Sequence, residues 1–256
     1  MGYEFPYDDW ADIYDAVNAE RTHDIGFYVR AAQRSGGPVL ELGCGTGRIG
    51  LAIAAKGVDL VGVDISPRIV EVANRKAHAQ GLEGKAIFQP GDMADVHVEG
   101  SYALVIFPFR SFQSMLDTDE QAAALASAAE HLAPGGTLIV DLFVPDPSQL
   151  AEPPGTLLHI ADVKQPDGGT VVVWGQNGWD PVSQVNQVRL VIEMLDPEGA
   201  VQRRLYRDFD QRYTFRYEME HLLARCGFTV EEVYGDFAGG PVTPDTEDLV
   251  FIAKRG

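Results

Sequence analysis

The sequence predicts an α/β fold, in which a mostly parallel sheet is covered by helices on both faces. Between residues 39 and 143, short apolar segments typical of strands alternate with segments that have the apolar spacing of helices. Short loops join these segments, and right-handed crossovers between parallel strands place the helices on both faces. The expected strands are residues 39–42, 59–64, 86–89, 102–107 and 137–143.

A glycine-rich turn follows the first expected strand and is the second observation behind this fold class. Gly43, Gly45 and Gly47 stand at alternate positions, where the absence of a Cβ allows a tight turn and lets main-chain N–H groups approach a ligand. Parallel topology places this turn at the carboxyl edge of the sheet, where open α/β sheets bind ligands. We therefore expect a cofactor site at the turn, with an ordinary glycine-rich βα turn as the alternative.

The helices between the strands have recognisable start signals. Ser66 and Pro67 supply an N-cap and a first-turn proline for a helix over about residues 67–80. Two further helices are expected at about 48–55 and 119–132.

The pattern changes after Pro145. Between about residues 156 and 212, segments rich in Val, Leu, Ile and Tyr are separated by turn signals with hairpin spacing, which predicts three to four antiparallel strands. Alternation then returns, with a helix at about 214–226 and strands at 228–234 and 249–253. We divide the chain into an N-terminal helical flap (1–34), a cofactor-binding core (35–145), an antiparallel β insertion (146–212) and the C-terminal part of the core (213–256).

Length and composition fit one soluble α/β domain with an insertion. The chain has 256 residues, 45% hydrophobic and 23% charged, and no apolar run is long enough to span a membrane. The first thirty residues lack the pattern of a signal peptide, so we expect a cytoplasmic protein with no membrane partner. A formal net charge of −18 repels phosphate backbones, so we expect no nucleic-acid partner. Cys44 and Cys226 lack metal-ligand spacing, so we expect two reduced thiols and no metal.

Two classes of cofactor combine a glycine turn after a first strand with an acid after the second. They are dinucleotides and S-adenosyl-L-methionine (SAM). Asp64 supplies the acid after the second strand, and Asp92 follows the third. A dinucleotide fold favours G-x-G-x-x-G, in which the third glycine permits close helix packing beside the pyrophosphate. Arg48 occupies that position, which weakens the dinucleotide interpretation and leaves it open.

Four motifs stand in order along residues 35–145: residues 41–47 (ELGCGTG), 63–67 (VDISP), 91–93 (GDM) and 132–136 (LAPGG). In these motifs the chain resembles the class I SAM-dependent methyltransferase family, in its small-molecule branch. The resemblance implies a Rossmann-like, seven-stranded, mostly parallel sheet whose last strand is antiparallel. It also implies SAM as the cofactor and S-adenosyl-L-homocysteine as its product.

The same resemblance implies roles for particular residues. Asp64 would accept hydrogen bonds from the two ribose hydroxyls, and Ile65 would pack on the adenine. Asp92 would accept a hydrogen bond from the adenine amino group, and the Met93 N–H would meet a ring nitrogen. Glu41 would steady the turn and lie near the methionine amino group of SAM.

Further implied contacts surround the methionine half of SAM. Gly43, Gly45 and Gly47 would make room for it, and Cys44 in the same turn is also expected among the cofactor contacts. Cys44 is expected to be a small buried residue and not a nucleophile. Phe107 would offer its carbonyl oxygen to the methionine ammonium.

Methyl transfer from a sulfonium is an in-line displacement, so the protein must chiefly align the nucleophile, the methyl carbon and the sulfur. An amine acceptor can shed its proton to water, whereas a hydroxyl or carbon acceptor usually needs a positioned base or a metal. The catalytic residues stay unassigned, with Tyr14 and His159 as candidates. Arg110 could meet a substrate carboxylate or phosphate, or one of the chain's own carboxylates. The substrate candidates are Tyr14, Phe109, Arg110, Phe112, Gln113, Trp174 and Tyr213.

The β insertion before the last helix also resembles the layout of small-molecule N-methyltransferases that act on amino sugars or glycine-like amines. In those relatives the insertion helps to form the acceptor pocket or a homodimer contact. We therefore expect a SAM-dependent methyltransferase with a small-molecule acceptor, favouring an amine. The alternatives are a dinucleotide-dependent oxidoreductase and a non-catalytic SAM-binding protein.

Overall fold

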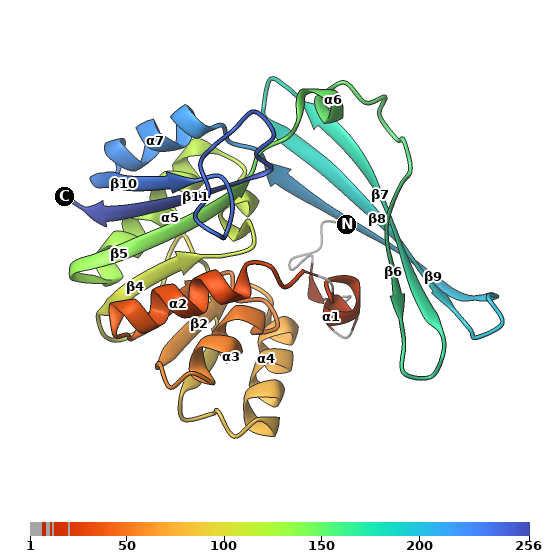
Figure 1. Cartoon of the computed structure of the whole chain (residues 1–256), viewed down its shortest axis with the longest axis horizontal. Helices are drawn as coiled ribbons and strands as arrows, with labels where there is room; N and C mark the ends of the chain where they lie inside the picture. Colours follow the sequence, from red (N-terminus) through yellow and green to blue (C-terminus); the bar gives the residue numbers. More distant parts are fainter. Residues whose placement is uncertain (1–6, 9–10, 12, 20) are drawn as a thin grey trace.

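The computed structural model describes residues 7–8, 11, 13–19 and 21–256, which contain two β-sheets with helices packed on the larger one (Figure 1). The larger sheet has seven strands in the order β10-β11-β5-β4-β1-β2-β3, and the smaller has four in the order β6-β7-β8-β9. The strands of the larger sheet are β1 (Val39–Leu42), β2 (Leu60–Asp64), β3 (Ala86–Pro90), β4 (Tyr102–Phe107), β5 (Leu132–Phe143), β10 (Phe228–Tyr234) and β11 (Asp248–Arg255).

The larger sheet is parallel except at one strand. β1 pairs in parallel with β2 and β4, with Val39 opposite both Leu60 and Leu104. β11 runs antiparallel to its neighbours β5 and β10. The chain passes from β1 to β2 and β3 and then returns to β4 on the other side of β1, so the strand order reverses there. Open α/β sheets bind ligands at the carboxyl ends of the strands that flank such a reversal.

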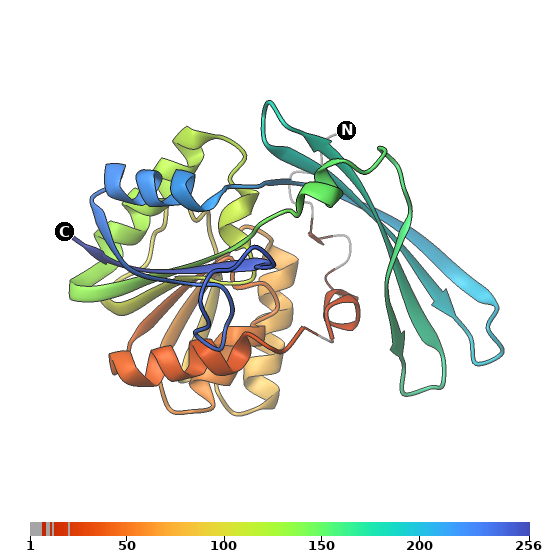
Figure 2. The same ribbon diagram turned by 45° about the horizontal axis from the view of Figure 1, so that its top comes forward.

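Helices cover both faces of this sheet, as Figures 1 and 2 show. On one face lie α2 (Ile25–Ser35), α3 (Arg48–Ala54) and α4 (Pro67–Ala79), and on the other lie α5 (Thr118–His131) and α7 (Arg216–Arg225). Buried apolar side chains form a core cluster on each side of the sheet. At the start of α4 the Ser66 hydroxyl accepts the Ile69 N–H, and Pro67 follows, as the sequence predicts. None of the described helices is long and apolar enough to cross a membrane.

The smaller sheet is antiparallel, and the short helix α1 (Tyr14–Val17) lies between it and the larger sheet (Figures 1 and 2). Side chains alternate along its strands, so Asn186 and Val188 are buried whereas Gln187 and Arg189 are exposed. Its buried face packs on side chains of the N-terminal segment. The strands are β6 (Leu158–Lys164), β7 (Thr170–Asp180), β8 (Val185–Leu195) and β9 (Val201–Arg212).

The expected fold class is confirmed, including the antiparallel last strand and an insertion of four antiparallel strands. β5 begins at Leu132 and not at residue 137, because Leu132 pairs with Tyr102 before a register shift. Two short elements were not foreseen, a 3-10 turn at Ser111–Ser114 and the helix α6 (Pro147–Leu150). The division of the chain into four segments stays a prediction.

The turn after β1 packs closely against the loop after β4. Gly43 and Gly45 both have positive φ, at 76° and 55°. A Cβ on Gly43 would lie 2.3 Å from the Ser111 Cβ, whereas the nearest atom to a Cβ on Gly45 is 3.9 Å away, on Tyr14. The Ser111 hydroxyl donates to the Leu42 carbonyl oxygen at 2.7 Å, which holds the two segments together. Glycine is therefore required at position 43 both by the positive φ and by the lack of room for a Cβ. At Gly45 only the positive φ favours glycine.

Alanine substitution should separate these two requirements. Gly43→Ala and Gly45→Ala each place a Cβ in the left-handed region, at a cost of about 1–2 kcal/mol. Gly43→Ala also overlaps Ser111, which adds about 1–3 kcal/mol. Chemical denaturation should therefore show a larger loss of unfolding free energy for Gly43→Ala than for Gly45→Ala. Equal losses would contradict the close packing of the two segments.

Candidate functional site

A cavity of about 520 Å³ lies between the carboxyl edge of the larger sheet and the buried face of the smaller one. The loops after β1, β2, β3 and β4 form one wall of this cavity. The N-terminal segment around α1 forms a second wall, and the smaller sheet forms a third. Segments far apart in the sequence thus enclose the glycine turn.

Two of the predicted cofactor contacts are the acids Asp64 and Asp92, and both line this cavity. The Asp64 carboxylate accepts the N–H of Gly45 at 2.9 Å and that of Ser66 at 3.0 Å. Burial raises the pKa of Asp64, and these two hydrogen bonds oppose the rise. Asp92 is exposed and accepts the Ala94 N–H at 2.8 Å. A carboxylate offers about four lone pairs, so both acids keep acceptor capacity for a ligand.

Four other predicted cofactor contacts also line the cavity: Gly43, Gly45, Ile65 and Met93. Ile65 is 42% exposed, which leaves it available to a flat apolar ligand group. Met93 is buried and reaches the cavity wall from the start of the loop after β3.

The remaining predicted contacts, Glu41, Cys44, Gly47 and Phe107, lie outside the lining. Glu41 is buried, its Oε2 has no partner among the described residues, and burial raises its pKa to about 8. Burial also raises the pKa of the Cys44 thiol, so it stays protonated at neutral pH. The Phe107 ring packs edge-on against Phe112 in the core, with 5.4 Å between ring centres. The roles of these four residues toward a cofactor stay predictions.

One buried carboxylate holds the loop after β4. Phe109 and Arg110 have φ angles of 55° and 64°, in the left-handed region that costs a residue with a side chain about 1–2 kcal/mol. Asp141 accepts hydrogen bonds from the N–H groups of both residues, at 2.8 and 2.9 Å, and from the Tyr28 hydroxyl. Burial raises the pKa of Asp141 to about 7, and the hydrogen bonds oppose the rise. Asp141 therefore stabilises a loop conformation that is unfavourable by itself.

Arg48 ties the N-terminal segment to the glycine turn. Its guanidinium donates to both carboxylate oxygens of the buried Asp24, at 2.6 and 2.7 Å, and to the Arg21 carbonyl oxygen at 2.8 Å. It also lies 4.7 Å from the centre of the Phe109 ring, at cation–π distance. Arg48, the residue that departs from the dinucleotide pattern, thus has a structural role that the sequence did not predict. The i, i+24 separation from Asp24 gives no local signal for it.

The partner of Arg110, which the sequence left open, is a carboxylate of the chain itself. Arg110 Nη2 lies 2.8 Å from Asp248 Oδ1, and the guanidinium lies 4.8 Å from the centre of the Phe143 ring. Because Arg110 lines the cavity, this ion pair sets the charge of one part of its wall.

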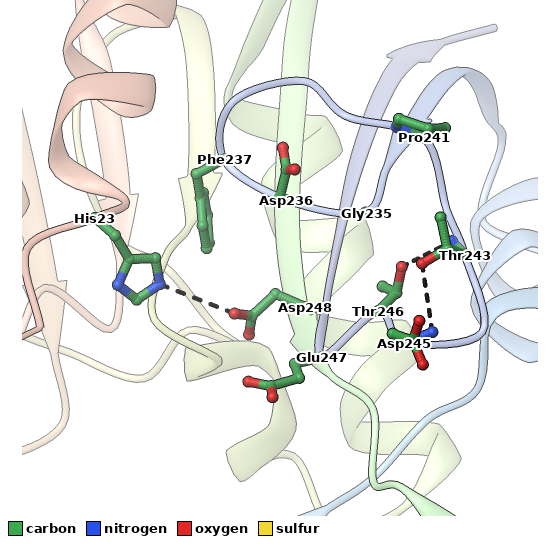
Figure 3. Close-up of a pocket in the computed structure, with 10 residues that line it drawn as sticks. All are labelled: His23, Gly235, Asp236, Phe237, Pro241, Thr243, Asp245, Thr246, Glu247 and Asp248. Atoms are coloured by element: carbon green, nitrogen blue, oxygen red, sulfur yellow. Dashed lines mark hydrogen bonds and ion pairs between the residues drawn. The ribbon is translucent and has the colours of Figure 1, made fainter.

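A second cavity of about 480 Å³ adjoins this ion pair, since Asp248 lines it (Figure 3). The loop between β10 and β11 forms most of it, and His23 faces Asp248 across it with 3.9 Å between Nε2 and Oδ2. Asp248 therefore stands between Arg110 of the first cavity and His23 of the second. Over the part of the chain that the structure describes, no group of three or more His, Cys, Asp or Glu residues could hold a metal ion.

Of the substrate candidates, the structure brings Tyr14, Phe109 and Arg110 to the lining of the larger cavity. Phe112 and Gln113 follow in the same loop but are fully buried in the core. The Gln113 amide exchanges two hydrogen bonds with the backbone of β5 and so fixes the end of that strand.

Three other candidates, Trp174, Tyr213 and His159, lie outside the lining. Trp174 and His159 are cross-strand partners on the face of the smaller sheet away from the cavity, because the lining positions of β7 are odd-numbered. Trp174 donates to Glu193 at 3.3 Å, and His159 lies 2.8 Å from Asp162. Tyr213 is buried just after β9. The catalytic assignment therefore stays open.

The sequence analysis missed the residues of the smaller sheet that do line the cavity. Asn177 and Trp179 on β7, Asn186 on β8 and Gln211 on β9 give this wall its polar side chains. Strand alternation could have grouped Asn177 with Trp179, because residues two apart in a strand share a face.

Comparison with known proteins agrees with this geometry. A family model described as a methyltransferase domain matches residues 39–136. The cypemycin N-terminal methyltransferase of a Streptomyces species is 26% identical over 255 residues, covering 97% of each protein. The methyltransferase CcbJ from Streptomyces caelestis has a TM-score of 0.82 and 24% identity, with both chains fully covered. SAM-bound CalS10, an amino pentose methyltransferase from Micromonospora echinaspora, has a TM-score of 0.73 and 22% identity, covering 95% of this chain and 97% of that one.

The matched segment contains the glycine turn, Asp64 at the end of β2, Asp92 in the loop after β3, and the strands β1 to β4 that present them at one edge. Residues 39–136 therefore match a methyltransferase domain, and the chain is similar over almost its whole length to SAM-dependent methyltransferases.

Proposed function

We propose that the chain methylates the nitrogen of a small-molecule amine bound in the larger cavity. The observation that carries this proposal is the chemistry of the lining. Among the lining residues that the structure describes there is no histidine, and burial raises the pKa of Tyr7 and Tyr14 well above the usual range. These phenols stay protonated near neutral pH and are poor bases. An amine needs no protein base, since the ammonium first loses one proton to water and the free lone pair of its nitrogen then attacks the methyl carbon. The nitrogen takes on the positive charge that the sulfur loses.

The turns after β1, β2 and β3 have the groups needed to hold SAM. Asp64 keeps lone pairs for the ribose hydroxyls, and Asp92 keeps them for the adenine amino group. Ile65 offers apolar surface to the adenine, and Gly43 and Gly45 leave the turn free of side chains beside the methionine half. Carboxylates occupied in this way are not available as bases for the acceptor.

SAM supplies a methyl group on a positively charged sulfur, and the sulfur leaves as a neutral thioether. The protein's own contribution is to align the amine and exclude water. Tyr7 packs against Tyr14 and Phe209, with ring centres 6.2 and 6.0 Å apart, and all three line the cavity. Aromatic rings attract a cationic amine when it lies over their faces, so this cluster favours the entry of such a group. The net charge of −18 attracts such amines and raises their local concentration.

Two of the similar proteins support nitrogen as the acceptor atom. One is described as an N-terminal methyltransferase and the other as an amino pentose methyltransferase. An amine is the acceptor group common to a peptide N-terminus and an amino sugar.

Replacing Asp64 should remove most of the affinity for the cofactor. Loss of two hydrogen bonds from the ribose hydroxyls to a carboxylate should weaken the binding of S-adenosyl-L-homocysteine about 100-fold. Isothermal titration calorimetry of Asp64→Ala measures this effect. Asp59→Ala is the matched control, because Asp59 precedes the same strand and pairs on the surface with Lys85. Unchanged affinity in Asp64→Ala, or an equal loss in both variants, would contradict the ribose contact.

Glu41 should release a proton when SAM binds at pH 7. With its pKa raised to about 8, the carboxyl group is mostly protonated before binding. The ammonium of SAM placed beside it would lower this pKa, so the proton passes to the buffer. The calorimetric binding enthalpy should therefore vary with the ionisation enthalpy of the buffer, and Glu41→Gln should remove this dependence. The same dependence in both proteins would exclude Glu41 as its source.

An amine and an alcohol of the same shape test the acceptor atom. The chain is incubated with SAM and either cyclohexylamine or cyclohexanol, and methylated products are identified by mass spectrometry. We expect the N-methyl product and no methyl ether, because the lining has no histidine and its carboxylates, Asp64 and Asp92, are assigned to SAM, which leaves no base for a hydroxyl. Methylation of cyclohexanol at a comparable rate would contradict an amine acceptor.

A further inference from the structure

Two polar residues of the smaller sheet face each other on the cavity wall. Trp179 on β7 and Asn186 on β8 are directly opposite partners in the antiparallel register, so their side chains leave the same face of the sheet. Both residues line the larger cavity. Their position is set by the backbone ladder, which holds the two side chains side by side.

Each of these side chains carries one buried polar atom without a partner among the described residues. These atoms are Trp179 Nε1, which can only donate a hydrogen bond, and Asn186 Oδ1, which can only accept one. The Asn186 amide group is fixed by its other end, because Nδ2 donates to the Asn177 Oδ1 at 2.9 Å. Buried polar groups in native proteins nearly always have a partner, so an unpaired donor and an unpaired acceptor on directly opposite residues require an explanation.

Packing alone does not explain the indole N–H of Trp179. Its ring packs against Phe143 and Tyr213, with ring centres 6.1 and 5.6 Å apart, and a phenylalanine ring could make the same type of contact. Trp174 on the same strand shows the usual situation, since its indole N–H donates to Glu193. Trp179 differs in that it lines the cavity.

We propose that Trp179 and Asn186 bind a hydroxyl group of the methyl acceptor. The hydroxyl oxygen accepts the hydrogen bond from Trp179 Nε1, and the hydroxyl hydrogen is donated to Asn186 Oδ1. An ammonium group would leave the Trp179 N–H unpaired, and a carboxylate would be repelled by the Asn186 oxygen. The inference rests on the proposed amine methylation in this cavity and narrows its substrate class to amino alcohols, including amino sugars.

The test compares cyclohexylamine with 2-, 3- and 4-aminocyclohexanol as acceptors. Methyl transfer gives kcat/KM for each amine, and calorimetry in the presence of S-adenosyl-L-homocysteine gives each Kd. We expect at least one aminocyclohexanol to exceed cyclohexylamine about tenfold in kcat/KM and in affinity, the effect of about one good hydrogen bond. Trp179→Phe and Asn186→Ala should each bring this ratio close to one. Gln187→Ala is the matched control, because Gln187 follows Asn186 on the exposed face, and it should keep the ratio.

The kinetic outcomes distinguish failure of the hydroxyl subsite from failure of the amine acceptor. The hydroxyl subsite is overturned if cyclohexylamine is methylated and every aminocyclohexanol has a similar kcat/KM. It is also overturned if an aminocyclohexanol keeps its advantage over cyclohexylamine in both variants. Either result leaves the amine acceptor intact. Binding of S-adenosyl-L-homocysteine without methylation of any of the four amines overturns the amine acceptor, and the subsite with it.

Discussion

The arrangement of the cavity depends on the buried Asp141 carboxylate, which joins three parts of the chain. Asp141 belongs to β5, the Tyr28 hydroxyl reaches it from α2, and the loop after β4 is bound through two backbone N–H groups. The bend held in this way sends the Phe109 ring toward Arg48 and the Arg110 guanidinium toward Asp248. Three donors compensate the loss of hydration of the carboxylate and fix the strained loop at the same time.

The N-terminal segment is placed over the cavity by charge as well as by apolar packing. The Arg48–Asp24 pair is largely removed from water, and the desolvation cost of such a pair offsets much of its attraction. Its main effect is therefore on position, because the bidentate geometry allows few relative orientations. Since Arg48 is the first residue of α3, the wall that carries Tyr14 is attached directly to the glycine turn. The wall formed by the N-terminal segment and the wall that contains the glycine turn are thus held in a fixed relation.

The sequence predicted the larger sheet and several residues of the cavity wall at its carboxyl edge because both depend on local signals. Gly43 and Asp64 follow apolar strands, and the parallel topology alone brings such positions to one edge. The residues of the cavity wall formed by the smaller sheet depend on which face of each strand meets the cavity. Trp174 was a candidate and Trp179 was not, although only the parity of their positions on β7 separates them. Whether the odd or the even positions of a strand face the cavity is decided by how the smaller sheet packs in the folded protein. The ion pair of Arg110 likewise joins residues 138 positions apart.

The construction of the cavity from two separate sheets has an evolutionary consequence. The larger sheet presents the groups proposed for SAM, and the smaller one presents side chains at alternate strand positions whose neighbours face away from the cavity. A substitution at one of these positions changes the pocket by a single side chain without altering the backbone ladder or the glycine turn. Acceptor selectivity in such a scaffold can therefore diverge quickly while the cofactor stays the same.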